Sequence, residues 1–488
     1  MEAPRLLAVL LLLANLNQYA SFFTTNRFCP YQLQPCLVAP VFLKAECDLA
    51  TEGTIECDDA LQPKPAATVW QVFGELAAKT NSINLGQGFP DWSPPDFVLD
   101  SLRGVVDTPY HQYTRPAGHP PLVELIGARY SKHFDRIIDP FNEVAITVGA
   151  SQALYLSLMT LTKPGDEVVM FEPFFELYLK QLKLTAASPV FVPLGGPGRA
   201  SADDPWGLDV DLLRKAITEK TKVLILNSPH NPTGKVFTLQ ELEAIAQVVR
   251  DNPQIIVLSD EVYKFSVYSA LGKGDSSAEG HYHFARIKDM FDRTITLSSC
   301  GKTFSVTGWQ VGWAVGPARY VQQMQEMLPC LQFCSSTPIQ HALTTALQVA
   351  DLPYKGFPNY YSWLRAQFLR KRMILEEGLR AVGVEPLASN GGFFLMGKLP
   401  LYKELTSGVG AGAPLDEPYD WRFCRMMAER YGISAIPASP FFSKEEHNSV
   451  GPMARFAFCK KDETLIGARD RLLTIAASSA FAKSKTLS

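Results

Sequence analysis

The sequence lacks an excess of charge of either sign, a long apolar run and an internal repeat. Its 488 residues carry 46 basic and 49 acidic side chains, and no basic stripe of the kind that binds nucleic acids is present. The most apolar stretch, near the amino terminus, is too short to span a bilayer. No Cys/His motif has the partner pair that a zinc site needs. We therefore expect no nucleic acid partner, no stable membrane insertion and no metal.

The amino-terminal segment has the pattern of a leader. Met1–Tyr19 carries one arginine, Arg5, before the run LLAVLLLLANL, which has the form of a signal-peptide core, although Glu2 weakens its basic start. Phe22–Pro65 shows no clear period and contains four cysteines. They could form two disulfides in a secreted domain, or be incidental in an unstructured leader. We favour the second interpretation, because nothing in this segment supplies a core of its own. The four are Cys29, Cys36, Cys47 and Cys57.

Three apolar runs later in the chain predict buried parallel strands. VLIL ends at Asn227, IIVL ends just before Asp260, and Thr294–Leu297 ends in small polar residues. Ligands of open α/β sheets bind at the carboxyl ends of the strands. Each run is followed by polar side chains that would meet at this edge: Asn227 and Asn231, Asp260 and Tyr263, Ser299 and Lys302.

Two of these side chains point to a particular chemistry. A lysine at the end of a core strand is costly to desolvate unless its amine has a task. Taken alone, Lys302 would be interpreted as a surface lysine on a loop. An aspartate that pairs with a pyridinium nitrogen and a lysine that forms a Schiff base are, however, the two requirements of a pyridoxal phosphate (PLP) site. Asp260 and Lys302 are candidates for these roles.

Four motifs in order carry a resemblance to a known family. They are Asn-Leu-Gly-Gln-Gly-Phe-Pro-Asp, Ser-x-x-Asn-Pro-x-Gly, Ser-Asp-Glu-Val-Tyr and Gly-Lys-Thr-Phe-Ser-x-Thr-Gly-Trp. From Ala67 to Leu473 the chain resembles the fold-type I, class I/II aminotransferases, in particular the kynurenine aminotransferase, glutamine transaminase K and cysteine-S-conjugate β-lyase group. Each motif alone is weak, but together they are specific.

The resemblance implies an α/β fold in two parts. A large PLP-binding domain, 111–380, would hold a mostly parallel sheet with helices on both faces. A smaller α+β domain would comprise 381–488, and 66–110 would form an arm and part of the small domain. The regular strand–helix alternation from Glu143 onward independently favours a parallel sheet.

The family's cofactor contacts map onto this sequence residue by residue. The turn Gly149–Gln152 opens a predicted helix whose free N–H groups suit a phosphate, although Ser151 could equally be a plain N-cap. Lys302 would bind the cofactor and move protons, Asp260 would hold the ring nitrogen, and Tyr263 would hydrogen-bond the ring oxygen. Tyr113 would reach the phosphate in the neighbouring subunit of a homodimer. The complete predicted cofactor set is Ala150, Ser151, Phe174, Asn227, Asn231, Asp260, Tyr263, Ser299, Lys302, Gln310 and Tyr113.

Four residues match the family's substrate contacts. Arg455 would bind the substrate α-carboxylate through its two-pronged guanidinium, although a surface salt bridge is the plainer interpretation. Trp70 would wall the pocket, or simply pack in the core. Gly88 would bring the backbone close to the substrate, and Asn231 would touch the carboxylate.

The resemblance implies a ping-pong aminotransferase. It would move an amino group from a bulky or aromatic amino acid, of the kynurenine, glutamine or phenylalanine type, to a 2-oxo acid. A β-lyase acting on cysteine S-conjugates, or a non-catalytic relative, is the alternative; the complete set of site residues argues against the latter. The family is cytoplasmic or mitochondrial, whereas the amino terminus leaves a secretory route open.

Two positions depart from the family pattern. Gln310 stands where the family has Lys or Arg for the cofactor phosphate, so we expect weaker cofactor retention. Cys334, next to Phe333, stands where some relatives have His, which leaves the amino donor open. We expect Cys334 and the other cysteines beyond the leader to be reduced thiols: Cys300, Cys330, Cys424 and Cys459.

Overall fold

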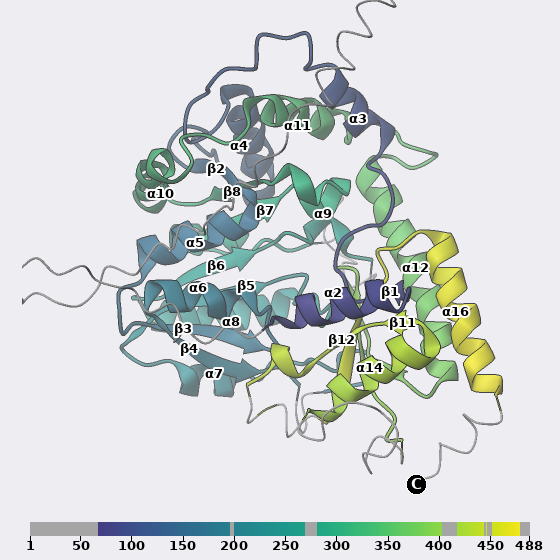
Figure 1. The fold of residues 1–488 in the computed structure, drawn as a ribbon. Helices are drawn as coiled ribbons and strands as arrows, with labels where there is room; N and C mark the ends of the chain where they lie inside the picture. The colour runs from purple at the N-terminus through teal and green to yellow at the C-terminus, as the bar shows by residue number, and fades with distance from the viewer. Residues whose placement is uncertain are drawn as a thin grey trace, which may run out of the picture. The chain divides into compact units, whose positions relative to one another are not determined.

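A seven-stranded sheet forms the centre of the larger half of the protein (Figure 1). The computed structural model describes residues 67–195, 200–268, 281–402, 417–443, 446 and 451–478. The predicted leader, 1–65, and most of the Gly/Pro-rich segment that follows Leu401 lie outside the described residues. The strands, in spatial order, are β2 (Val144–Val148), β8 (Val311–Val315), β7 (Thr294–Ser299), β6 (Ile256–Asp260), β5 (Thr221–Asn227), β3 (Glu167–Glu172) and β4 (Ser188–Pro193).

The pairing of these strands confirms the prediction of a mostly parallel sheet. The neighbours from β7 through β6, β5 and β3 to β4 are all parallel, and β8 is antiparallel to both β7 and β2. In register, Asn227 lies opposite Asp260, and Asp260 lies opposite Leu297. The carboxyl ends of β5, β6 and β7 therefore meet at one edge, as the three apolar runs predicted.

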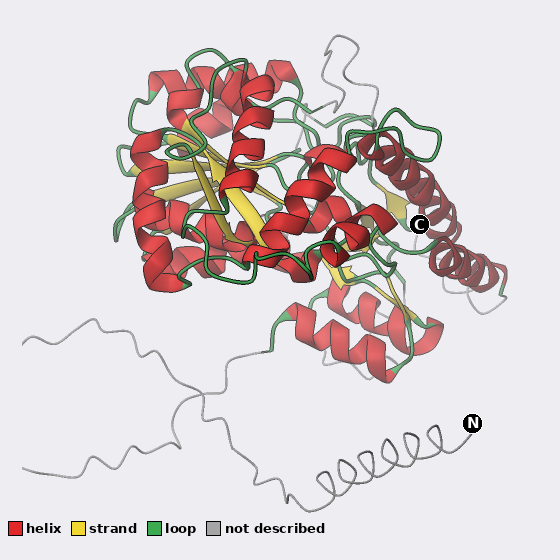
Figure 2. Ribbon diagram, turned by 90° about the horizontal axis from the view of Figure 1, so that it is seen from above, coloured by secondary structure: helices red, strands yellow, loops and turns green. Residues whose placement is uncertain are grey.

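Helices cover both faces of this sheet (Figure 2). Successive residues of a strand point to opposite faces, so Val168 and Met170 pack in one cluster with α5 and α10, while Val169 and Phe171 pack in another with α8. The helices of this half are α4 (Pro120–Phe134), α5 (Gly149–Leu161), α6 (Leu177–Thr185), α7 (Val210–Ala216), α8 (Leu239–Asp251), α9 (Gly301–Phe304), α10 (Ala318–Leu331) and α11 (Thr337–Val349). Burial on both faces explains why the strands are continuously apolar.

A smaller antiparallel sheet is built from the carboxyl-terminal part. Its order is β12 (Ile436–Pro437), β13 (Met453–Ala457), β10 (Phe394–Lys398) and β9 (Glu385–Pro386). The amino-terminal arm joins this part, because β1 (Ile83–Asn84) pairs with β11 (Ile433–Ser434) and α2 packs on α14. The associated helices are α2 (Val69–Lys79), α12 (Tyr360–Ala381), α14 (Tyr419–Tyr431) and α16 (Asp462–Ala477), whereas α3 (Asp96–Arg103) packs on α11 of the larger half.

These elements belong to one unit, Ala66–Ser488. Short 3-10 turns connect several of them, at Lys264–Ser266, Phe284–Arg286, Phe291–Arg293, Thr307–Trp309 and Ser439–Phe441. The division at residues 110 and 380 stays a prediction. In the part of the chain that the structure describes, no helix combines the length and apolarity needed to cross a membrane.

Candidate active site

A cavity of about 470 Å³ opens where the carboxyl ends of β5, β6 and β7 meet the start of α5. Segments far apart in the sequence line it, from α2 at the arm to β13 in the small sheet. The structure brings together all but two of the predicted site residues. The cavity is lined by Trp70, Gly88, Ala150, Ser151, Asn227, Asn231, Asp260, Tyr263, Ser299, Lys302, Gln310 and Arg455.

Lys302 lies at the start of the short helix α9, directly after strand β7. Its Nζ donates a hydrogen bond to the Gly88 carbonyl at 2.9 Å. Burial lowers the pKa of Lys302 to about 8, because the charged amine is removed from water. An amine with this pKa exchanges protons near neutral pH, as a general acid and base must.

Asp260 ends strand β6 and carries the main acidic group of the cavity floor. Burial raises the pKa of Asp260 to about 6, while a hydrogen bond from Tyr178 opposes that shift. The Tyr178 hydroxyl lies 2.7 Å from Oδ2 of Asp260. A buried carboxylate that receives one strong donor is still short of a counter-charge, so a cationic group placed beside Asp260 would be stabilised.

A chain of hydrogen bonds links this floor to Arg455. The Asn227 amide donates to the Asp260 carbonyl at 2.9 Å and its Oδ1 accepts from the Asn231 backbone N–H at 2.7 Å. The Asn231 Oδ1 in turn accepts from Nη1 of Arg455 at 3.1 Å. Each amide is therefore oriented by its neighbours, which leaves the two asparagines little freedom to rotate.

Arg455 is a buried cation with no carboxylate partner among the described residues. Its side chain is 1% exposed, its Nη2 donates to the Gly86 carbonyl at 2.9 Å, and its Nε has no hydrogen-bond partner. Burial lowers the pKa of Arg455 to about 10. Its guanidinium carbon lies 4.0 Å from the ring centre of Phe394 and 4.7 Å from that of Trp70. An arginine held in this way is suited to receive an anion that the protein itself does not provide.

The start of helix α5 forms the opposite end of the cavity. Gly149 has φ +69°, and a Cβ on Gly312 would lie only 2.4 Å from the Gly149 carbonyl carbon, so glycine at 312 allows β8 to approach the turn. The Gly149 N–H donates to the Gln310 carbonyl at 2.8 Å, and the next residues of this first turn, Ala150 and Ser151, line this end of the cavity, where the start of a helix favours an anion. Gln310 has φ +50°, and its side-chain amide donates a hydrogen bond to the Thr307 carbonyl.

Two predicted residues lie elsewhere. Phe174 is buried in the core and stacks on Phe191, with ring centroids 5.1 Å apart, whereas Phe175 lines the cavity. Phe174, which was assigned to the cofactor ring, therefore does not line the cavity, and the adjacent Phe175 does. Tyr113 is 80% exposed and lies outside the cavity, packed on Phe333 at 4.6 Å.

The cavity also contains residues that the sequence analysis missed. Tyr178 holds Asp260 from α6, Glu176 accepts a hydrogen bond from Trp70, and Phe394 lies against Arg455. None belongs to one of the four motifs. Only the fold brings α6 and β10 to the cavity, so no local pattern could have identified them.

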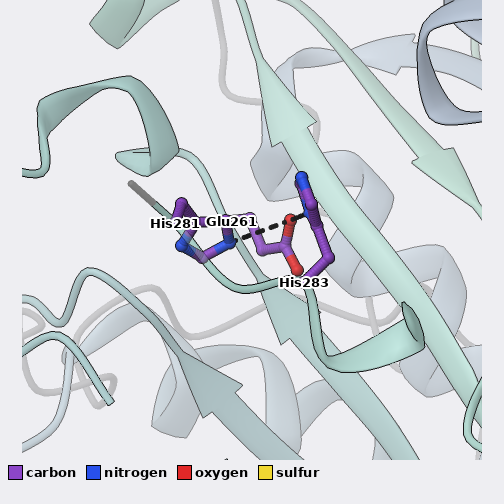
Figure 3. A group of neighbouring side chains, drawn as sticks. All are labelled: Glu261, His281 and His283. Carbon is purple, nitrogen blue, oxygen red and sulfur yellow. Dashed lines mark hydrogen bonds and ion pairs between the residues drawn. The ribbon is translucent and has the colours of Figure 1, made fainter. Parts of the chain in front are cut away.

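Figure 3 shows a second cluster of titratable groups, Glu261, His281 and His283. The buried Glu261 carboxylate lies 2.6 Å from Nδ1 of His283 and 3.3 Å from Nε2 of His281, and Ser259 donates to its other oxygen. Two ligands of a tetrahedral zinc would be about 3.3 Å apart. The shorter contact is a hydrogen bond that leaves no room for an ion between the two groups. The negative charge of Glu261 contributes to the raised pKa of Asp260.

Comparisons with known proteins point to one family. Residues 80–464 match the model of aminotransferase class I and II. The chain is 35% identical over 424 residues to a kynurenine–oxoglutarate transaminase of Dictyostelium discoideum, covering 84% of this chain and 94% of that one. Kynurenine–oxoglutarate transaminase 1 of Homo sapiens is 34% identical over 411 residues, covering 83% and 94%.

The fold is also similar to solved structures. N-succinyldiaminopimelate aminotransferase from Mycobacterium tuberculosis superposes with a TM-score of 0.71 at 34% identity, over 84% of this chain and 97% of that one. The fold-type I architecture expected from the motifs is thereby confirmed. The chain belongs to the aminotransferase class I and II family and is a PLP-dependent transaminase.

Proposed function

We propose that this enzyme transfers the amino group of an aromatic or other bulky amino acid to a 2-oxo acid, with Lys302 as the catalytic base. The observation that carries the proposal is Arg455, a buried cation that forms no ion pair with any described carboxylate and that shares one cavity with a lysine of lowered pKa. An α-carboxylate at Arg455 would supply the missing charge. The amino acid would then be held by its carboxylate while its α-carbon faces the Lys302 amine.

Several features of the cavity fit PLP, on which members of this family depend. Among the described residues no cation forms an ion pair with Asp260, on which Lys302 acts only as a minor influence, and the protonated ring nitrogen of PLP would provide a direct partner. The α5 turn and the hydroxyls of Ser151 and Ser299 would hold the phosphate. Tyr263, Asn227 and Asn231 would face the ring oxygen, and Phe175 rather than Phe174 would contact the ring.

When bound, PLP would withdraw electrons from the substrate α-carbon and so make its proton acidic. The residues of the chain would do the rest. The Lys302 amine, neutral in part because burial lowers its pKa, would remove the α-proton and return it to the adjacent carbon of the cofactor. Asp260 would remain ionised opposite the ring nitrogen. Arg455 and Asn231 would fix the carboxylate, so that the α-carbon–hydrogen bond stays within reach of Lys302.

Aromatic walls support a bulky substrate side chain. Trp70, Phe175 and Phe394 line the same cavity as Arg455, and apolar rings favour a ligand with a large apolar side chain. The relatives named above act on kynurenine according to their names. We propose the same class of substrate for this enzyme. Gly88, which has no side chain, would allow the backbone to lie close to the substrate.

The first experiment is a visible absorbance spectrum of the purified protein, with the Lys302→Ala variant beside it. A band of enzyme-bound PLP that is bleached by kynurenine or phenylalanine and restored by a 2-oxo acid is the expected result. The variant should show neither change. A band that persists with every amino acid tested would contradict the proposed reaction.

We also propose that the enzyme is a homodimer in which Tyr113 reaches the partner's active site. Tyr113 and Phe333 form an aromatic pair on the surface, 80% and 49% exposed, which is typical of a surface that is covered in an assembly. Tyr113→Ala subunits mixed with Lys302→Ala subunits should regain activity, because one site of each hybrid would have both residues. No recovery in a confirmed hybrid would rule out a shared site.

A further inference from the structure

Glu176 places a carboxylate on the wall of the cavity, close to the substrate side. It lies at the amino-terminal boundary of α6, lines the cavity and has a side chain that is 16% exposed. Its Oε1 accepts a hydrogen bond of 2.6 Å from the indole Nε1 of Trp70. This contact joins the arm to the large sheet across 106 positions of sequence and fixes the plane of the indole.

The indole that Glu176 holds covers the carboxylate-binding arginine. The Trp70 ring centre lies 4.7 Å from the guanidinium carbon of Arg455, and Trp70 also packs on Phe441 at 6.1 Å. From outside, Lys180 contacts the same Glu176 oxygen at 2.7 Å. The four side chains form a continuous series, Lys180, Glu176, Trp70 and Arg455, in which the carboxylate sets the position of the ring over the cation.

The negative charge of Glu176 is only partly offset. Lys180 is 49% exposed, so water screens its charge, whereas Glu176 lies mainly within the protein. Both hydrogen bonds go to Oε1, and no described group donates to Oε2. The carboxylate also acts on Arg455, whose pKa it raises against the larger effect of burial. A second anionic group entering this part of the cavity would therefore meet a negative field.

We propose that Glu176 is a specificity-determining residue that positions Trp70 over Arg455 and disfavours substrates with a second carboxylate. It selects neutral bulky side chains over acidic ones such as that of glutamate. This inference rests on the proposed function, because it assumes that Arg455 binds the α-carboxylate. The α-carboxylate is held at the arginine, and the side chain must then pass the Trp70 and Glu176 wall.

Binding of two unreactive acids to the holoenzyme tests the charge without any turnover. Isothermal calorimetry with 3-phenylpropionate and glutarate gives the ratio of their affinities. In Glu176→Gln that ratio should shift about tenfold toward glutarate, because the Glu176 carboxylate no longer repels the second carboxylate of glutarate. The matched control is Asp211→Asn on the surface of α7, where the carboxylate pairs with Arg214 and the ratio should stay unchanged. An unchanged ratio in Glu176→Gln would overturn the proposal.

Kinetics test the positioning of Trp70. Glu176→Ala should raise the KM for phenylalanine about three- to tenfold, with a smaller change in kcat. Glu176→Gln should restore most of that KM, because its amide oxygen still accepts from the indole. In a Trp70→Phe background, which has no indole N–H, Glu176→Ala should add little. An equal loss in both backgrounds would show that Glu176 does not act through Trp70. Absence of turnover in the parent enzyme would instead refute the proposed function and leave the binding ratio to decide this inference.

Discussion

The two ends of the cavity are both suited to an anion, yet they are built in opposite ways. At one end Arg455 offers a full positive charge that is buried among aromatic rings and has no anionic partner among the described residues. At the other, the α5 turn and Gln310 offer only N–H groups and a neutral amide, and Gln310 and Ser151 are exposed. Binding at the Arg455 end therefore depends on a full charge that is shielded from water, whereas binding at the α5 end depends on N–H and amide dipoles that are exposed to water.

This difference predicts how each end binds its anion. A charged hydrogen bond that is shielded from water contributes more than a neutral one, and leaving its partner unpaired is costly. The Arg455 end should therefore discriminate strongly between ligands with and without a carboxylate. The α5 end should bind a phosphate more weakly than a site that contains a cation would. Its affinity for phosphate should therefore increase markedly when a positive charge is added beside it.

Removing the cation from the buried end should give the largest effect. Arg455→Gln should raise the KM for phenylalanine or kynurenine about a hundredfold or more, since a charge-assisted pair shielded from water is lost. Steady-state kinetics at saturating cofactor measure this effect. The bound PLP absorbance should change little, because Arg455 lies at the other end from the α5 turn.

The control for this variant is Arg103→Gln. Arg103 is an exposed arginine on α3 that pairs with Asp100 at 2.6 Å, so its loss removes the same charge far from the cavity. Its kinetics should match those of the parent. Equal losses in the two variants would mean that net charge, rather than a carboxylate site, explains the effect.

The residues at the strand ends and the surroundings of Arg455 differ in how well the sequence predicted them. The motifs placed Lys302, Asp260, Asn227 and Asn231 correctly at the strand ends, because a strand's carboxyl end is marked by the stop of its apolar run. Gln310 was identified as a departure because the family motif has Lys or Arg at this position. Trp70 was predicted to line the pocket, but the contact of Phe394 with Arg455 could not be predicted, because Phe394 comes to it from another strand, β10.

Errors in the sequence analysis have physical causes. Phe174 and Phe175 are adjacent and chemically identical, and only the turn before α6 decides which one faces the cavity. Helices α4 and α16 and strand β4 were not predicted, although Pro120 at the start of α4 and Asp462 at the start of α16 are usual starting residues.

Adding a cation beside the α5 turn should increase the affinity for PLP, whereas removing the Arg455 cation should weaken binding at the opposite end. Gln310→Lys should bind PLP about 10- to 100-fold more tightly, as expected for a new charge-assisted contact to the phosphate. Gln310→Glu should bind it more weakly, by repulsion. Titration of the cofactor-free protein with PLP, followed by tryptophan fluorescence, measures both. If the two substitutions gave equal affinities, the phosphate would not lie at the α5 turn.

Lys302 lies between the two ends, and its charge should destabilise the cofactor-free protein. Burial lowers its pKa from 10.5 to about 8, so the unfolded chain binds more protons than the folded one between these two values. The penalty is therefore complete at pH 7 and disappears as pH rises through this window. Lys302→Met should be more stable than the parent by about 1–3 kcal/mol at pH 7, with the difference lost near pH 11. Urea unfolding of both cofactor-free proteins at the two pH values measures it; a difference independent of pH would contradict the assigned cause.

The smallest effect should come from removing the hydrogen bond that Tyr178 donates to Asp260. This bond helps to keep the Asp260 carboxylate ionised. Tyr178 donates to its Oδ2 at 2.7 Å and so opposes the increase in pKa that burial causes. Tyr178→Phe keeps the ring but removes the donor, so the pKa of Asp260 should rise further and the carboxylate should be protonated at a higher pH. We expect kcat/KM to fall about three- to tenfold at pH 7 and its acidic limb to move to higher pH. Tyr155→Phe on α5 is the matched control, since Tyr155 does not line the cavity. A lower kcat/KM with an unshifted acidic limb would mean that Tyr178 supports the shape of the floor rather than the ionisation of Asp260.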